Sequence, residues 1–343
     1  MARMTSPAPL TPGGPSRRVL LRAASLGGSV LTLAGLAGCG VRLEHLAAPP
    51  PAARVPVTDE AALLRVLTVT SFLAPLAARV RPGSPTTTRL AALQGAQASV
   101  VRDRLRTAGV PDAVTGAARA PAAPAAQTPS PPSDSAGSPA TTTSAPATAT
   151  IAVLGAAETT ALTSDLLVVL PRLSTANRSL VAAIASCAAA GAVELGRPVA
   201  WPAADPLPGA AAAALLDSSR AAAYGLEVAA ARLEGDERAA VLATLGTMRH
   251  RVLSLLAAAG ASAHPAPLGY PLPFTLDGVG AVRRVVAHVL TGLVASGLVP
   301  LTTGTIARGS SATTTLVRLQ ADAVGMARSW GVTPTAFPGM VAA

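Results

Sequence analysis

The cysteine with the most specific surroundings in this sequence is Cys39, which directly follows Leu36, Ala37 and Gly38. A lipoprotein signal peptidase needs small residues beside its cut, and the cysteine thiol then carries a diacylglycerol. The pattern is typical of a bacterial lipobox, so we predict that residues 1–38 are a removable signal peptide. Each buried CH₂ of an attached chain contributes about 0.8 kcal/mol, so two or three chains on Cys39 would hold the protein at a membrane surface.

A pair of arginines, Arg17 and Arg18, precedes the apolar run that leads to this cysteine. The pair resembles the twin-arginine motif, which a receptor reads in order to export proteins that are already folded. A transmembrane anchor would need about 20 consecutive apolar residues, a length reached here only by including Arg22. We therefore expect an extracytoplasmic protein that is anchored to the outer face of the cell membrane as a lipoprotein.

Other reactive groups show no catalytic arrangement in the sequence. Cys187 is the only cysteine besides Cys39 and lies in the alanine-rich run "IASCAAAGA", which predicts a small buried residue and no disulfide framework. No Gly-x-Ser-x-Gly nucleophile elbow and no phosphate-binding glycine loop occurs. We expect no catalytic residues, and we expect that the protein is not an enzyme.

Composition favours helices and argues against a nucleic-acid partner. All 27 basic residues are arginines, and the net charge of +10 is spread along the chain without a basic cluster interleaved with aromatics. Only 2% of the residues are aromatic while half are apolar, so a core must be built mainly from Ala, Leu and Val. Such a core predicts an all-α fold.

Apolar spacing and breaker residues divide the rest of the chain into segments. We expect a lipidated tether over residues 39–57, a helical hairpin over 58–109, a second helical pair over 151–200 and a larger helical domain over 207–340. Residues 110–150 are rich in Pro, Ala, Ser and Thr with almost no large apolar side chain, which predicts a disordered insert. The last helical domain contains two helix pairs joined by the long connection "HPAPLGYPLPFTLDG", as in a ferritin-like bundle.

Four stretches within residues 207–340 carry a family resemblance: "ALLDSSRAAAYGLEVAAARL", "MRHRVLSLLAAAGA", "GYPLPF" and "TPTAFPGM". They resemble a ferritin-like domain family of unknown function found in secreted twin-arginine lipoproteins of GC-rich Gram-positive bacteria. The resemblance implies a ferritin-like four-helix bundle, preceded by a second bundle-like part that the N-terminal helices form.

The same resemblance implies a departure at the position where a metal-binding carboxylate would lie. Family members often carry a Glu-His pair before the tyrosine that matches Tyr224, and this chain has Ser219 and Arg220 there. No Glu-x-x-His pair, which a di-iron bundle needs, occurs in the sequence. We therefore expect no metal ligands and no cofactor. If a metal did bind, its ligands would be unconventional ones around Glu158, Glu227, His250 and His288.

The sequence favours a non-catalytic module of the cell envelope that serves binding or scaffolding, with no intact di-iron site. Its partners would be the membrane, through the lipid on Cys39, and an unknown protein or small apolar ligand. The alternative is a ferritin-like oxidoreductase or a carrier of a cofactor or metal, since the twin-arginine route often exports proteins that fold around cofactors.

Overall fold

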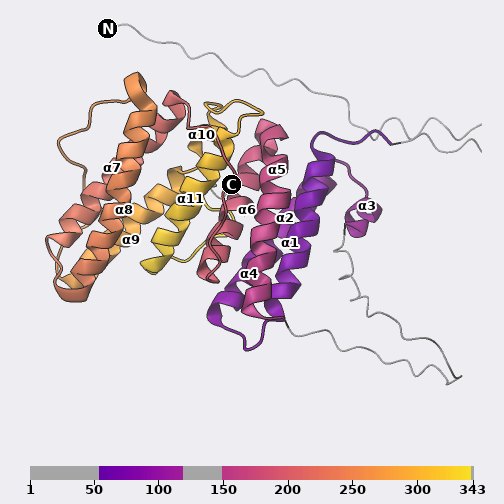
Figure 1. Cartoon of the computed structure of the whole chain (residues 1–343), viewed down its shortest axis with the longest axis horizontal. Coiled ribbons are helices and arrows are strands. Elements are labelled where there is room, and N and C mark those ends of the chain that lie inside the picture. The colour runs from indigo at the N-terminus through magenta and orange to yellow at the C-terminus, as the bar shows by residue number, and fades with distance from the viewer. Residues whose placement is uncertain (1–53, 119–148, 341–343) are drawn as a thin grey trace, which may run out of the picture. The chain divides into compact units, whose positions relative to one another are not determined.

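The computed structural model describes residues 54–118 and 149–340, which are largely helical and contain no strand. This confirms the all-α class that the composition predicts. The helices, shown in Figure 1, are α1 (Glu60–Ala78), α2 (Pro85–Thr107), α3 (Asp112–Ala117), α4 (Ile151–Thr160), α5 (Leu167–Val169), α6 (Thr175–Glu194), α7 (Gly209–Ala230), α8 (Gly235–Ala259), α9 (Val279–Ser296), α10 (Val299–Thr302) and α11 (Ala312–Ser329).

Local sequence explains where α2 begins. The side chain of Ser84 accepts a hydrogen bond from the Thr87 backbone N–H, and the Thr87 hydroxyl accepts one from the Ser84 N–H. This reciprocal capping box satisfies two amide donors that the first turn leaves free, and Pro85 fits the first helical position.

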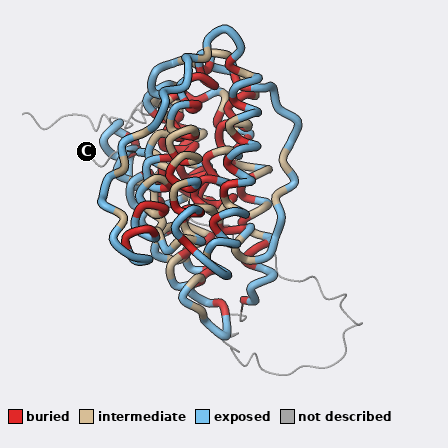
Figure 2. The backbone as a smooth tube through the Cα atoms, turned by 90° about the vertical axis from the view of Figure 1, so that its left-hand side faces the viewer, coloured by how far each residue is buried: buried red, intermediate tan, exposed pale blue. Residues whose placement is uncertain are grey.

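Helix α6 forms the centre of the first half of the described chain. It consists largely of Ala and other small residues, and nearly all of its residues from Asn177 to Ala192 are buried. A helix with apolar residues all round must be covered on every side. It packs against α4, α2 and α11, and one hydrophobic core runs from α1 through α6 to the first turns of α7 and α11. Figure 2 shows the buried residues along the inward faces of the helices.

A second hydrophobic core joins α7, α8, α9 and α11. Helices α7 and α8 form a hairpin, a connection of about twenty residues follows, and α9 packs against both α7 and α11. The first half repeats this order with the pair α1 and α2, a long connection, and the pair α4 and α6. The residues from Val55 onwards nevertheless form a single compact unit, so the two expected helical parts share a core.

Three details differ from the sequence-based expectations. The ends of the expected insert are ordered, because Val110 is buried, α3 follows it, and Ala149 pairs with Val80 in an isolated bridge. The first helix of the pair expected over 151–200 is interrupted by a π-helical turn, Ala161–Leu166. Within the domain expected over 207–340, the loop between α10 and α11 contains two glycines with positive φ, Gly304 and Gly309, and α11 begins only at Ala312.

The predicted signal peptide and most of the tether lie outside the described residues, as do residues 119–148 of the expected insert. Among the described helices, four stretches are long and apolar enough to cross a membrane by length and composition alone: Glu60–Ala78, Ile151–Arg172, Thr175–Glu194 and Val279–Thr302. The last of these contains part of residues 285–306, which the sequence favours as a bundle helix because His288 and Pro300 interrupt it.

Candidate functional site

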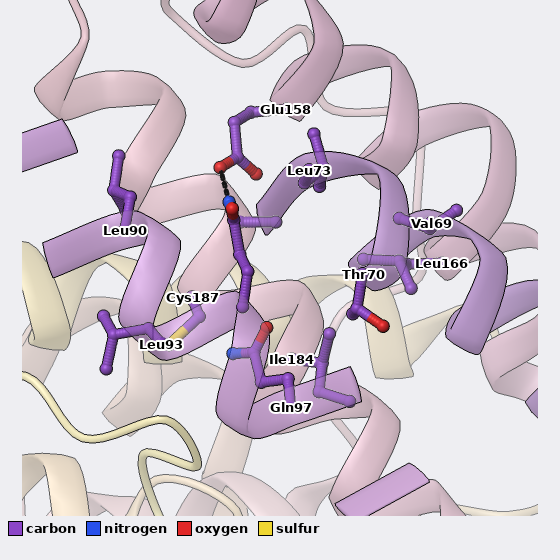
Figure 3. Close-up of a pocket in the computed structure, with 12 residues that line it drawn as sticks. Val69, Thr70, Leu73, Leu90, Leu93, Gln97, Glu158, Leu166, Ile184 and Cys187 are labelled. Carbon is purple, nitrogen blue, oxygen red and sulfur yellow. Dashed lines mark hydrogen bonds between the residues drawn. The ribbon is translucent and has the colours of Figure 1, made fainter. Parts of the chain in front are cut away.

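A small internal cavity lies where α1, α2, α4 and α6 meet. Its lining is apolar apart from Glu158, Gln94, Gln97, Thr70 and Cys187. The volume that the centre of a water molecule could occupy in it is about 10 Å³, which is close to the smallest volume that holds one water. Figure 3 shows the side chains pointing into this space from the four helices. The cavity is too small for an organic substrate.

The most perturbed group in this cavity is the carboxyl of Glu158, which is fully buried. Burial raises its pKa to about 8, and a hydrogen bond from the amide of Gln94 to Oε1 opposes the shift without cancelling it. The carboxyl is therefore mostly protonated at pH 7. Gly191 of α6 lies beside the carboxyl, and a Cβ at that position would meet Oε1 at 3.8 Å, an ordinary contact, but would crowd Cδ2 of Leu90 at 3.0 Å.

A proton on the Glu158 carboxyl would give two buried, unpaired oxygen atoms a hydrogen bond to each other. Oε2 of Glu158 and Oε1 of Gln94 are buried without a hydrogen-bond partner. A carboxylic acid and a primary amide can pair through two hydrogen bonds, in which the amide N–H donates to one carboxyl oxygen and the acid O–H donates to the amide oxygen. The second bond would join these two oxygens, so the pair is satisfied when Glu158 is neutral.

Cys187 lines the same cavity, and its thiol is expected to be unreactive. Burial, and secondarily the charge of Glu158, raise the pKa of its thiol to about 12. Its Sγ lies 3.4 Å from the carbonyl oxygen of Thr335, and the neighbouring Gln97 donates to the carbonyl of Ala336 at 2.8 Å. A protonated thiol is a poor nucleophile. The prediction of a small buried residue is confirmed.

A second buried polar pair lies among α7, α8 and α11. Ser219 is fully buried, donates to the carbonyl of Leu215 at 2.8 Å, and accepts a bond of 3.2 Å from Nε of Arg251. Nη1 of Arg251 donates to the carbonyl of Leu319 at 2.6 Å. Burial lowers the pKa of this guanidinium to about 10, while Asp322 acts in the opposite direction.

The position where the resemblance places a carboxylate is thus occupied by a hydroxyl and a cation. At pH 7 Arg251 remains positively charged, so it repels a metal ion that Ser219 could not hold in any case. Ser219 is fully buried on the same face of α7 as Leu215 and Ala222.

The other groups that the sequence singles out as unconventional metal ligands do not converge. Glu227 is exposed and pairs with Arg249 at 2.7 Å, His250 is exposed, and the His288 ring packs edge-on against Phe274 with centroids 5.6 Å apart. Within residues 54–118 and 149–340 no three His, Cys, Asp or Glu side chains are grouped closely enough to hold a metal ion.

The residues predicted for export and lipidation, Arg17, Arg18 and Leu36 to Cys39, lie outside the described residues. Their roles stay predictions from the sequence. Sequence reasoning missed the pairing of Glu158 with Gln94 and the burial of Arg251. The burial of Gln94 could have been predicted, because Gln94 and Gln97 are three residues apart and share a helix face with Leu90 and Val101.

Comparison with protein-family models, with curated proteins and with solved structures finds no match to this chain.

Proposed function

We propose that this protein is a lipoprotein of the cell envelope, exported by the twin-arginine route and anchored through Cys39 to the outer face of the cell membrane. The observation that carries the proposal is the run from Arg17 to Cys39, which combines paired arginines, an apolar stretch without acids and a complete lipobox. The compact unit begins at Val55, inside the tether that the sequence predicts over residues 39–57 between the lipid and the body.

The body of the protein is a binding or scaffolding module with a ferritin-like arrangement and no intact di-iron site. The common core of α7, α8, α9 and α11 and their order of hairpin, long connection and second pair support this arrangement. The pairing of Ser219 with Arg251 argues against a metal at the place that the resemblance indicates.

The surface offers larger hollows than the interior does. One of about 420 Å³ lies between α6 and α11, with Trp201 and Met326 on its wall. Such a hollow favours a protein partner or a small apolar ligand over a reaction at the buried polar groups.

Intact-mass analysis of the membrane fraction tests the anchor. The wild-type chain should begin at Cys39 and carry a diacylglycerol, and Cys39→Ala should lose the lipid. Cys187→Ala is the matched control, because it removes the only other cysteine and should leave the lipid in place. An unmodified Cys39 in the wild type contradicts the proposal.

The same membrane preparations also test whether the lipid alone holds the protein at the membrane or whether its helices span the bilayer. Among the helices that the structure describes, four have the length and hydropathy of a membrane span, although Thr175–Glu194 is 78% buried inside the protein. We expect Cys39→Ala protein to leave the membrane on extraction with alkaline carbonate. Retention in the bilayer contradicts the proposed bundle. Stoichiometric metal, or an absorbing cofactor in protein from its native host, would favour the oxidoreductase or carrier alternative.

A further inference from the structure

The hollow of about 420 Å³ between α6 and α11 has a largely apolar wall. The two helices lie side by side near the middle of the molecule (Figure 1), and the connection from α6 to α7 contributes Trp201 to the wall. Val193, Met326 and small alanines of both helices also line the hollow. A pocket of this size with an aromatic ring and aliphatic side chains favours a ligand that carries apolar groups.

One charge centre of the hollow has an excess of positive charge. Glu194, at the C-terminal end of α6, forms ion pairs with both Arg89 and Arg328. One carboxylate therefore balances only one of two guanidinium groups. Arg328 lines the hollow and its side chain is 33% exposed. Because a guanidinium has five N–H groups, Arg328 retains donors that can bind a second carboxylate.

The other charge centre is the carboxylate of Asp322, which also lines the hollow. Among the residues that the structure describes, no group forms a hydrogen bond or an ion pair with it. Burial by the surrounding protein raises the pKa of Asp322, although Arg318 and Arg251 act in the opposite direction. A carboxylate that has lost water and has no direct partner is stabilised by a cation that enters the site.

The two charge centres are separated along α11. Asp322 and Arg328 are six residues apart, which corresponds to about 9 Å along a helix axis. Gly325 lies between them, and a Cβ there would meet nothing within 4 Å, so this part of the hollow is open. Across the two centres, two carboxylates balance two guanidinium groups. A ligand with opposite charges at its two ends therefore matches the hollow better than one with a net charge.

A short peptide with free termini has this distribution of charge. In an extended tripeptide, at about 3.4 Å per residue, the ammonium and the carboxylate are about 10 Å apart. Both peptide termini are common points of recognition in binding sites. A free α-amino acid carries the same two groups too close together to reach both centres.

We propose that the hollow between α6 and α11 binds a short apolar peptide, with its N-terminal ammonium at Asp322 and its C-terminal carboxylate at Arg328. The inference deepens the proposed binding role, on which it rests, by naming the class of ligand. It does not depend on lipidation of Cys39.

Isothermal titration calorimetry with the tripeptide Ala-Leu-Ala tests the proposal on the full chain carrying Cys39→Ala. Saturable binding is expected. The N-acetylated peptide lacks the ammonium and the C-amidated peptide lacks the carboxylate, so each should bind at least about tenfold more weakly. Lipidation of Cys39 is measured separately by mass, so failure of the anchor and failure of the hollow give different results.

Variants of the two charge centres assign the ends of the peptide. Asp322→Asn should weaken binding of the free peptide at least about tenfold, but should leave binding of the N-acetylated peptide unchanged. Arg328→Gln should weaken binding of the free peptide to the same extent and leave binding of the C-amidated peptide unchanged. Glu194 keeps its ion pair with Arg89 in the second variant, so the fold should be retained.

Gly325→Leu tests the location without changing a charge. Its side chain would fill open space in the hollow, so binding should weaken at least about tenfold, while Leu is a better helix former than Gly. Asp236→Asn and Arg238→Gln are the matched controls, because both residues are exposed in the first turn of α8 and neither lines the hollow. Circular dichroism checks that each variant is folded.

Three results would overturn the proposal: no saturable binding of the tripeptide, equal binding of either capped peptide, or unchanged binding in any of the three variants of the hollow. Tighter binding of the C-amidated peptide also overturns it and assigns the hollow to an organic cation. Tighter binding of the N-acetylated peptide overturns it in favour of an organic anion.

Discussion

Replacing Glu158 by Gln should make the protein more stable at neutral pH while leaving its stability in mild acid unchanged. The carboxyl is buried and neutral at pH 7, with a pKa of about 8 against 4.5 for its ordinary value. Because the folded protein holds this proton over a range where the unfolded chain has released it, unfolding is increasingly favoured as the pH rises. Gln has nearly the same shape, does not titrate, and can pair with Gln94 through its own amide.

The size of the effect follows from the two pKa values. Between pH 4.5 and about 8 the wild type should lose about 1.4 kcal/mol of unfolding free energy per pH unit relative to Glu158→Gln. The difference between the two proteins is then close to zero at pH 4.5, about 3 kcal/mol at pH 7 and about 5 kcal/mol above pH 8. Below the ordinary pKa both states are protonated, and the difference disappears.

Urea denaturation followed by circular dichroism from pH 4.5 to 8 measures this difference. Staying below pH 8 avoids titration of Cys187, the thiol that shares the cavity, and the effect of Asp322 is common to both proteins. Glu227→Gln is the matched control, because Glu227 is exposed and paired with Arg249, and its curve should follow the wild type between pH 6 and 8. Parallel curves for wild type and Glu158→Gln would refute the assignment of a buried neutral carboxyl.

Two further predictions concern stability. Gly297→Ala should cost about 2 to 3 kcal/mol in urea denaturation, because the new Cβ would overlap with Oε1 of the fully buried Gln320. Gly292→Ala is the control: its new Cβ meets nothing within 4 Å, so it should be neutral or slightly stabilising. Asp59→Asn should cost about 1 kcal/mol, because the Asp59 carboxylate accepts bonds from the backbone and hydroxyl of Ser174 at the start of α6. Burial raises the pKa of Asp59, but the hydrogen bonds outweigh burial, so the net pKa lies below its ordinary value. The stabilisation by the Asp59 carboxylate should therefore be present at pH 5 and fade as the pH falls through that lowered pKa. A cost for Asp59→Asn that persists undiminished at pH 2 would contradict this explanation.

The helices could be predicted because their signals are local. Apolar spacing and glycine or proline breakers predict a hairpin over 58–109 and a helical pair over 151–200, where the structure has α1 with α2 and α4 with α6. The burial of Ser219 follows from the same periodicity, since it lies on one face with Leu215 and Ala222. Such patterns depend on residues three or four apart and need no tertiary structure.

The buried polar pairs could not be predicted in the same way, because their members come from distant segments. Gln94 and Glu158 are 64 residues apart, and Ser219 and Arg251 are 32 apart. Each of these residues alone resembles an ordinary polar side chain on a helix. Arg251 lies three residues after Met248, on the buried face of α8, but a charged residue there is expected at the surface until its partners are known.

The bonds from Gln97 and Cys187 to the carbonyls of Thr335 and Ala336 have a consequence for biosynthesis. The hydrogen-bond acceptor of Gln97, the carbonyl of Ala336, is synthesised 239 residues after it. At a synthesis rate of about 5–20 residues per second, this delay is roughly 10–50 s, during which one side of the first helices stays uncovered. This side of the first half is therefore covered only when the chain is almost complete.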